Sequence, residues 1–215
     1  GGVTTAGDAD TITIDVNNGS GLTVNDGVTS TNGDIALSAD DDVIFGVNGD
    51  VASTNGDVSV TADADLNGNG SGGNLTMADG AEIDAGTGSI SLRADENITV
   101  GRIVTTGINA TVVSLISSSA GVVDAGDTNA EDIDADGVGA ITSVRTVTGF
   151  GIPVSGGTNV DIEVDLNTLT VVNSGQGNIT VTETDSVTLD DGDNVLNNGI
   201  FNEDGDFNIN AGVNV

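Results

Sequence analysis

The chain has 215 residues, with 34 aspartates and glutamates against 3 arginines and no lysine, histidine or cysteine, for a formal net charge of −31. This charge repels phosphates and three arginines cannot form a basic groove, so a nucleic-acid partner is excluded. No run of about 18 apolar residues is present, so we expect no membrane insertion. High charge with only 2% aromatic residues favours disorder, but 36% of the residues are hydrophobic and many alternate with polar residues, which indicates strands.

The first clear repeat begins near residue 30, because the segment at 30–40 returns in similar form at 53–63. In each copy a glycine and a small polar residue precede two apolar residues at alternate positions and, usually, an alanine. The glycines that open this frame are Gly33, Gly56, Gly88, Gly177 and Gly205. An aliphatic residue follows ten positions after each of them, at Val43, Leu66, Ile98, Val187 and Val215. Each copy therefore predicts two short strands joined by a polar corner.

Period-2 alternation places the apolar residues of each predicted strand on one face, and a single strand pair cannot bury that face alone. Stacked coils bury it as a continuous column and gain ladder hydrogen bonds with their neighbours. The Asn-Gly pairs at 32–33 and 55–56 supply tight corners. We predict an all-β fold, a parallel β-helix (β-solenoid) with roughly 20–25 residues per coil and inserted loops.

The spacing of the frame varies along the chain. The step from Gly56 to Gly88 is longer than the step from Gly33 to Gly56, which fits one coil plus a loop inserted at 68–73. The interval from Gly88 to Gly177 is long enough for several coils, and strands are predicted there at 111–117, 140–147 and 160–166. We therefore expect a single elongated solenoid over residues 1–215. Residues 108–175 are less regular, and an inserted small domain is the alternative for that region.

The frame Gly-Asp-Ile-x-Leu-x-Ala-Asp at residues 33–40, echoed at Gly56 and Gly88, resembles the coils of filamentous haemagglutinin-type exoproteins, bacterial surface proteins built from degenerate β-strand repeats. The resemblance covers residues 7–107 and 175–215. It implies a right-handed, three-sided β-helix, an extracellular location at the bacterial cell surface, and adhesion or fibre formation. The chain departs from that family in its acid load and its lack of lysine, which point toward calcium or high salt.

The sharpest short motif is Asp132-Ile133-Asp134-Ala135-Asp136-Gly137. Alternate carboxylates followed by a glycine open the common calcium loop. An EF-hand needs a glutamate at the twelfth position, which is Ser143 here. We therefore predict a non-helical Ca²⁺ site at Asp132, Asp134 and Asp136, completed by Glu131 or Asp127, with a solvated acidic corner as the alternative.

Two further acidic clusters fall at predicted corners, where stacked carboxylates repel one another and a cation would relieve the repulsion. They are weaker Ca²⁺ candidates, because acid on an exposed shaft also serves solubility. Their residues are Asp190, Asp191, Asp193, Asp204 and Asp206.

The chain has no histidine or cysteine and no nucleophile or phosphate-loop motif, so we expect no catalysis. With 34 acids, a carboxylate pair at hydrolase spacing arises by chance, and a polysaccharide-active β-helix enzyme is a minor alternative. The expected function is a calcium-stabilised secreted structural protein that self-associates into a filament, sheath or surface layer. The alternative is the shaft of a large adhesin whose binding tip, for glycans or a host surface, lies elsewhere.

Overall fold

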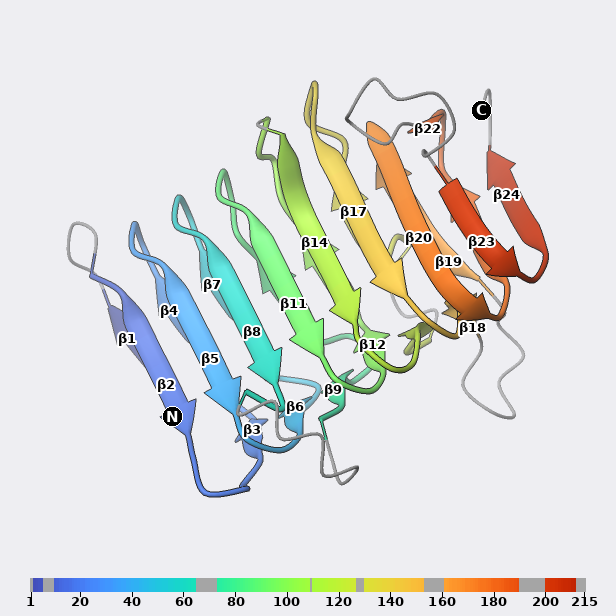
Figure 1. Ribbon diagram of the computed structural model, residues 1–215. Coiled ribbons are helices and arrows are strands. Elements are labelled where there is room, and N and C mark those ends of the chain that lie inside the picture. The colour runs from blue at the N-terminus through green and yellow to red at the C-terminus, as the bar shows by residue number, and fades with distance from the viewer. Residues whose placement is uncertain are drawn as a thin grey trace.

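The computed structural model describes residues 2–5, 10–64, 73–108, 110–126, 130–152, 161–189 and 200–211. In these residues the fold is all-β, and all of the strand pairs are parallel. Nowhere in them is there a helix that could cross a membrane. The strands stack in chain order, with β1 and β24 at opposite ends of the stack (Figure 1). The predicted parallel β-solenoid is confirmed.

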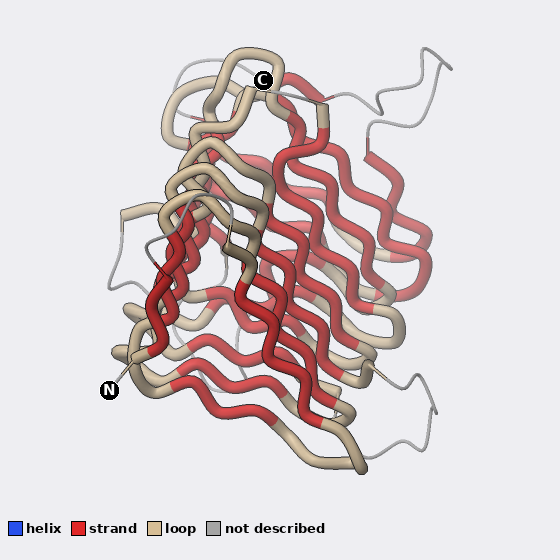
Figure 2. The backbone as a smooth tube through the Cα atoms, turned by 90° about the vertical axis from the view of Figure 1, so that its left-hand side faces the viewer, coloured by secondary structure: helices blue, strands red, loops and turns tan. Residues whose placement is uncertain are grey.

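Each coil adds one strand to each of three rows (Figure 2). Row 1 contains β1 (Val3–Thr5), β4 (Val28–Ser30), β7 (Val51–Ser53), β10 (Glu82–Asp84), β13 (Arg102–Val104), β16 (Ile133–Ala135) and β19 (Ile162–Leu166). Row 2 contains β2 (Ile12–Val16), β5 (Ile35–Ala39), β8 (Val58–Ala62), β11 (Ile90–Ala94), β14 (Thr111–Ser117), β17 (Ile141–Thr146) and β20 (Thr168–Gln176). Row 3 contains β3 (Leu22–Val24), β6 (Val43–Phe45), β9 (Leu75–Met77), β12 (Ile98–Val100), β15 (Val122–Asp124) and β18 (Phe150–Ile152).

The three rows become two near the end of the stack. Strand β21 (Ile179–Glu183) pairs with β18 through Ile179 and with β19 through Val181, so rows 1 and 3 belong to one sheet. Strand β24 (Phe207–Ala211) then pairs with β21. In the sheet of row 2, β22 (Thr188–Leu189) and β23 (Ile200–Asp204) both pair with β20.

The register follows the repeat frame. Ile35 pairs with Val58, and Val58 pairs with Ile90 across a longer stretch of chain, as the expected insertion requires. Later coils contain long connections too, such as the one between the paired residues Ile133 and Val164. The strands within residues 108–175 pair in the same rows as those before them. The frames at Gly177 and Gly205 form β21 and β24, in a different sheet from the frames at Gly33, Gly56 and Gly88.

The core is a set of aliphatic columns. In row 3, each inward residue stacks on the next along Val43, Leu75, Ile98, Val122, Phe150 and Ile179, and all six are 0% exposed. Full burial of each such side chain contributes roughly 1.5–3 kcal/mol. At the two ends the columns are uncovered: Val3 is 44% exposed, Phe207 is 45% exposed, and a hollow of about 210 Å³ lies beside Val3, Leu22 and Val28.

Buried hydroxyls satisfy the backbone at the corner between rows 1 and 2. The Ser53 hydroxyl donates to the Gly33 carbonyl oxygen at 3.0 Å and accepts from the Gly56 amide at 2.9 Å. On the solvent-exposed side of this corner, the side-chain amide of Asn55 donates a hydrogen bond to the side-chain oxygen of Asn32 at 2.7 Å. Because buried backbone groups need partners, these contacts explain why the Ser-Thr-Asn-Gly corner recurs in successive coils.

Candidate metal centre

The three aspartates of the predicted calcium loop lie in different environments. Asp132 precedes β16 and is 0% exposed, Asp134 lies within β16 and is half-buried, and Asp136 follows the strand and is exposed. Among the described residues, one carboxylate trio has ligand oxygens spaced to share a metal ion, and these three aspartates are not that trio. Metal binding by Asp132, Asp134 and Asp136 together stays a prediction.

Asp132 is a buried acid beside other acids. Its Oδ2 accepts a hydrogen bond from the Glu163 amide at 3.2 Å, whereas its buried Oδ1 has no hydrogen-bond partner among the described residues. Burial raises the pKa of Asp132 to about 9, and the neighbouring carboxylates of Asp124 and Glu163 contribute to the rise. Burial and the neighbouring carboxylates therefore both favour the protonated form of Asp132.

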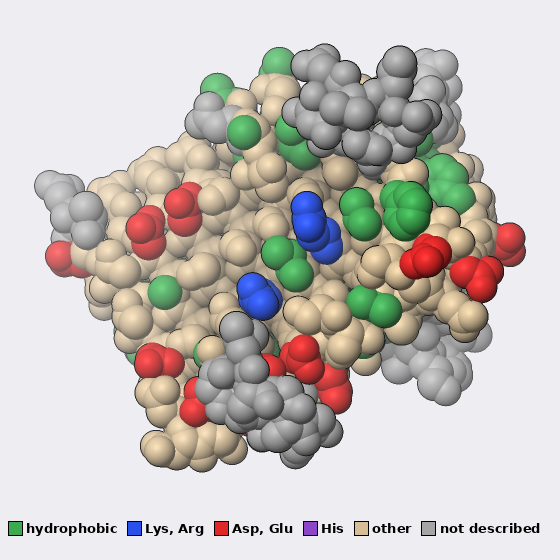
Figure 3. All heavy atoms as spheres, viewed as in Figure 1, with side chains coloured by type: hydrophobic (Ala, Val, Ile, Leu, Met, Phe, Trp, Pro, Cys, Tyr) green, Lys and Arg blue, Asp and Glu red, His purple; other side chains and the backbone are tan. Residues whose placement is uncertain are grey.

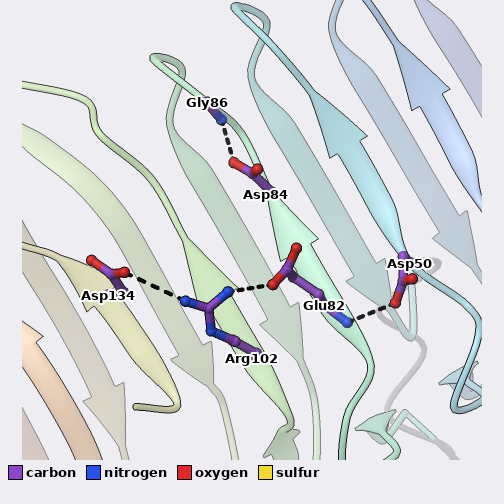
Figure 4. Close-up of polar contacts among 6 residues, drawn as sticks. All are labelled: Asp50, Glu82, Asp84, Gly86, Arg102 and Asp134. Atoms are coloured by element: carbon purple, nitrogen blue, oxygen red, sulfur yellow. Dashed lines mark hydrogen bonds and ion pairs between the residues drawn. The ribbon is translucent and has the colours of Figure 1, made fainter. Parts of the chain in front are cut away.

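Asp134 already has a cationic partner. The Arg102 guanidinium on β13 is ion-paired with Glu82 on β10 and lies 3.5 Å from the Asp134 carboxylate on β16 (Figure 4). Burial raises the pKa of Asp134, and the positive charge of Arg102 opposes that rise. The Glu82 amide also donates to Asp50 at 3.1 Å, so this polar network extends along row 1.

The trio that can share an ion consists of Asp165, Glu183 and Asp185, whose ligand oxygens all lie within 4.8 Å of one another. Two oxygens that are each about 2.4 Å from a Ca²⁺ ion can be at most about 4.8 Å apart, so this spacing fits one cation. Asp165 lies on β19, Glu183 ends β21 and Asp185 follows it. Val164 of β19 pairs with Glu183, which brings the two strands' acids together.

The trio is electrostatically costly without a counter-ion. Glu183 is 2% exposed, and its burial raises its pKa to about 7, against the opposing hydrogen bonds from the Leu166 and Asp185 backbone. Burial also raises the pKa of Asp165, and the carboxylates of Asp136 and Asp185 raise it further. The predicted residues Asp134 and Asp136 thus lie in the electrostatic field of the trio.

The weaker predicted candidates lie elsewhere. Asp190, Asp191 and Asp193 lie outside the described residues. Asp204 and Asp206 are exposed at the turn between β23 and β24, where backbone groups of both residues hydrogen-bond to the preceding coil. They are not part of the trio.

The sequence holds one signal for the trio, in the repeat frame at Gly177. Glu183 occupies the frame position that is alanine in the other four copies, at Ala39, Ala62, Ala94 and Ala211. An acid at an inward-facing position of a strand needs a compensating partner.

Comparison with protein-family models, with curated proteins and with solved structures found no match.

Proposed function

We propose that the chain is a structural β-solenoid that packs side by side with copies of itself in an extracellular filament, sheath or surface layer. The observation that carries this proposal is the outer face of row 2 from β5 to β20, which differs from the rest of this acidic molecule. The exposed Asp15 lies on β2, at the edge of the row. The outward residues of β5, β8, β11, β14, β17 and β20 include no carboxylate, whereas they include two of the three arginines, Arg93 and Arg145.

The outer face of β5, β8, β11, β14, β17 and β20, here called the arginine face, has no acidic side chain around its two arginines. In one outward row, Arg93, Ile116 and Arg145 lie on three successive strands in register. The parallel row beside it contains only small side chains, namely Ala36, Ser59, Ser91, Ser114, Ser143 and Thr170. Both arginines are exposed, and neither makes an ion pair with a described residue. Figure 3 shows the two basic side chains in the middle of this face, with acidic side chains nearer its margins.

Row 1 of the same molecule has the complementary pattern. Asp84, Val104 and Asp134 lie in register on three successive strands and point outward. Strands in a sheet are about 4.8 Å apart, so the two aspartates, like the two arginines, are about 9.6 Å apart along the stack. Row 1 of one copy can therefore present acid, valine and acid to the arginine, isoleucine and arginine of another. Asp134, which lies 3.5 Å from Arg102 of its own chain, would then be shared between two arginines.

The ends of the stack are open in a filament protomer and in an adhesin shaft alike. The strands of the first coil pair on one side only within the described residues, and the columns at both ends are uncovered. Neighbouring copies would cover these ends in a filament, and further coils of a longer chain would cover them in an adhesin shaft. Side-by-side packing through the arginine face is expected of the structural protein and therefore distinguishes the two.

The proposal predicts that the variant Arg93→Gln/Arg145→Gln associates about tenfold more weakly than the wild type, because two complementary contacts are lost while self-repulsion grows. Sedimentation equilibrium in about 0.15 M salt measures the association, and electron microscopy shows whether long assemblies form. The net charge of this variant is two units more negative than the −31 of the wild type.

The matched control is Thr23→Asp/Asn48→Asp, which lowers the net charge equally at two exposed positions outside rows 1 and 2. The control is expected to associate nearly as well as the wild type. Equal weakening of both variants would mean that net charge alone governs association. A wild type that remains as short monodisperse rods would contradict self-assembly and favour the adhesin shaft.

A further inference from the structure

We propose that Asp165, Glu183 and Asp185 bind a calcium ion, which fastens β21 onto β19 where rows 1 and 3 merge. The argument for this site does not rest on the side-by-side packing described above, although Asp165 pairs with Asp134 and so continues the outward row of Asp84 and Val104. The site differs from the Asp-x-Asp-x-Asp loop at 132–136. Three carboxylates with oxygens within 4.8 Å of one another provide the spacing.

The buried oxygen of Glu183 is the independent observation that points to a ligand. Glu183 is 2% exposed, and its Oε1 accepts a hydrogen bond from the Leu166 amide at 3.3 Å. Its Oε2 is buried and has no hydrogen-bond partner among the described residues. A buried carboxylate oxygen left without a donor is costly, and a metal ion shared with Asp165 and Asp185 would satisfy it.

No basic side chain is placed to satisfy this oxygen instead. The chain has no lysine or histidine. Arg102 is ion-paired with Glu82 and Asp134, and Arg93 and Arg145 lie on the outer face of row 2. Neutralisation of the trio therefore has to come from a proton on one of its own carboxyl groups or from a cation taken up from solution.

The donor set selects a hard divalent cation. All three side chains offer oxygen, and the chain contains no histidine or cysteine to favour zinc, copper or iron. Ca²⁺ accepts six to eight oxygens in irregular geometry, with carboxylates binding through one or both oxygens and water completing the shell. Mg²⁺ requires a near-ideal octahedron and gives up its waters reluctantly. Ligands that come from a strand, a strand end and the following turn suit Ca²⁺ better.

The ion would connect successive coils. Asp165 belongs to β19, and Glu183 and Asp185 belong to the next layer of the stack. Strand β21 also supports β24 through five register pairs from Ile179 to Glu183. Calcium is therefore expected to protect the β19–β24 region more than the coils of β1–β9.

The test uses the full chain, stripped with a chelator and titrated with CaCl₂ by calorimetry to about 10 mM, which spans the affinities of extracellular calcium modules. Glu183→Gln keeps the shape of the side chain and is expected to lower the calcium affinity of one binding site by tenfold or more. The exposed acid Glu203 on β23 offers the matched control, Glu203→Gln, which is expected to bind as the wild type does. Hydrogen exchange with and without calcium should place the added protection at β19 and β21.

Two results would overturn the site. One is a wild type that binds no calcium over this range, and the other is unchanged binding by Glu183→Gln. If that variant fails to fold, Asp185→Asn provides the same test, because Asp185 is exposed and its replacement leaves the core intact. Calorimetry at concentrations where the chain is monomeric keeps this result separate from self-assembly.

Discussion

Replacing Gly56 by alanine is expected to destabilise the solenoid by at least about 3 kcal/mol. A Cβ atom at this position would lie 2.3 Å from the carbonyl oxygen of Gly33 in the preceding coil. The opposing atom is backbone, so no side-chain rotation can relieve the clash and the two coils would have to separate. Gly88 stands in the same relation to Gly56, also with a 2.3 Å approach, which makes this corner a column of close backbone contacts.

Urea unfolding followed by circular dichroism measures this effect, and hydrogen exchange locates it if the coils unfold in separate steps. Gly27→Ala is the matched control, because a Cβ atom there would have no neighbour closer than 3.9 Å. The control is expected to change the free energy of unfolding by less than about 1 kcal/mol. Similar small effects for both variants would mean that the coils separate at this corner without cost.

The strands that could be predicted are mainly the longer ones. The strands predicted at 111–117, 140–147 and 160–166 overlap β14, β17 and β19. The frames at residues 35–39, 58–62 and 90–94 coincide with β5, β8 and β11, and those at 179–183 and 207–211 coincide with β21 and β24. The three-residue strands of row 1 were not predicted, because three residues are too few to reveal a period. Alternation also cannot tell one sheet of a solenoid from another, since every sheet buries the same kind of face.

The candidate site was harder to predict for a related reason. The Asp-x-Asp-x-Asp motif indicates carboxylates on one side of a strand, but β16 contains only Asp134, so Asp132 turns into the buried corner and Asp136 lies beyond the strand end. Asp165 and Glu183 are separated in the sequence by less than one predicted coil. They meet because β21 pairs with both β18 and β19, an arrangement that no local pattern encodes.

The stability of the chain in chelator is expected to fall as the pH rises, and Asp132 is expected to be a main cause. Its pKa is about 9 in the folded chain and about 3.9 in an unfolded one. Between these values the folded chain holds a proton that the unfolded chain has released. The stabilising contribution is therefore complete below about pH 3.9 and is lost as the pH rises toward the folded-state pKa.

The slope for one such proton is about −1.4 kcal/mol in the free energy of unfolding per pH unit. Asp132→Asn removes the titratable proton of this side chain and keeps an oxygen that accepts from the Glu163 amide. The free energy of unfolding of this variant is therefore expected to fall with pH less steeply than that of the wild type, by about this slope. Urea unfolding of the wild type and of Asp132→Asn at each pH between about pH 7 and about pH 8.5 isolates the effect. Glu183, with a pKa of about 7, titrates in both chains, so its contribution cancels in the difference.

The groups that face Asp132 determine how this experiment is controlled. Asp124 on β15 and Glu163 on β19 raise its pKa, whereas Arg102 on the neighbouring β13 is engaged by Glu82 and Asp134. Asp136→Asn removes an acid of the same kind from an exposed position nearby and is expected to leave the slope unchanged. If Asp132→Asn and the wild type lose stability at the same rate with pH, Asp132 is ionised in the folded chain. The acids around it would then need a cation instead of a proton.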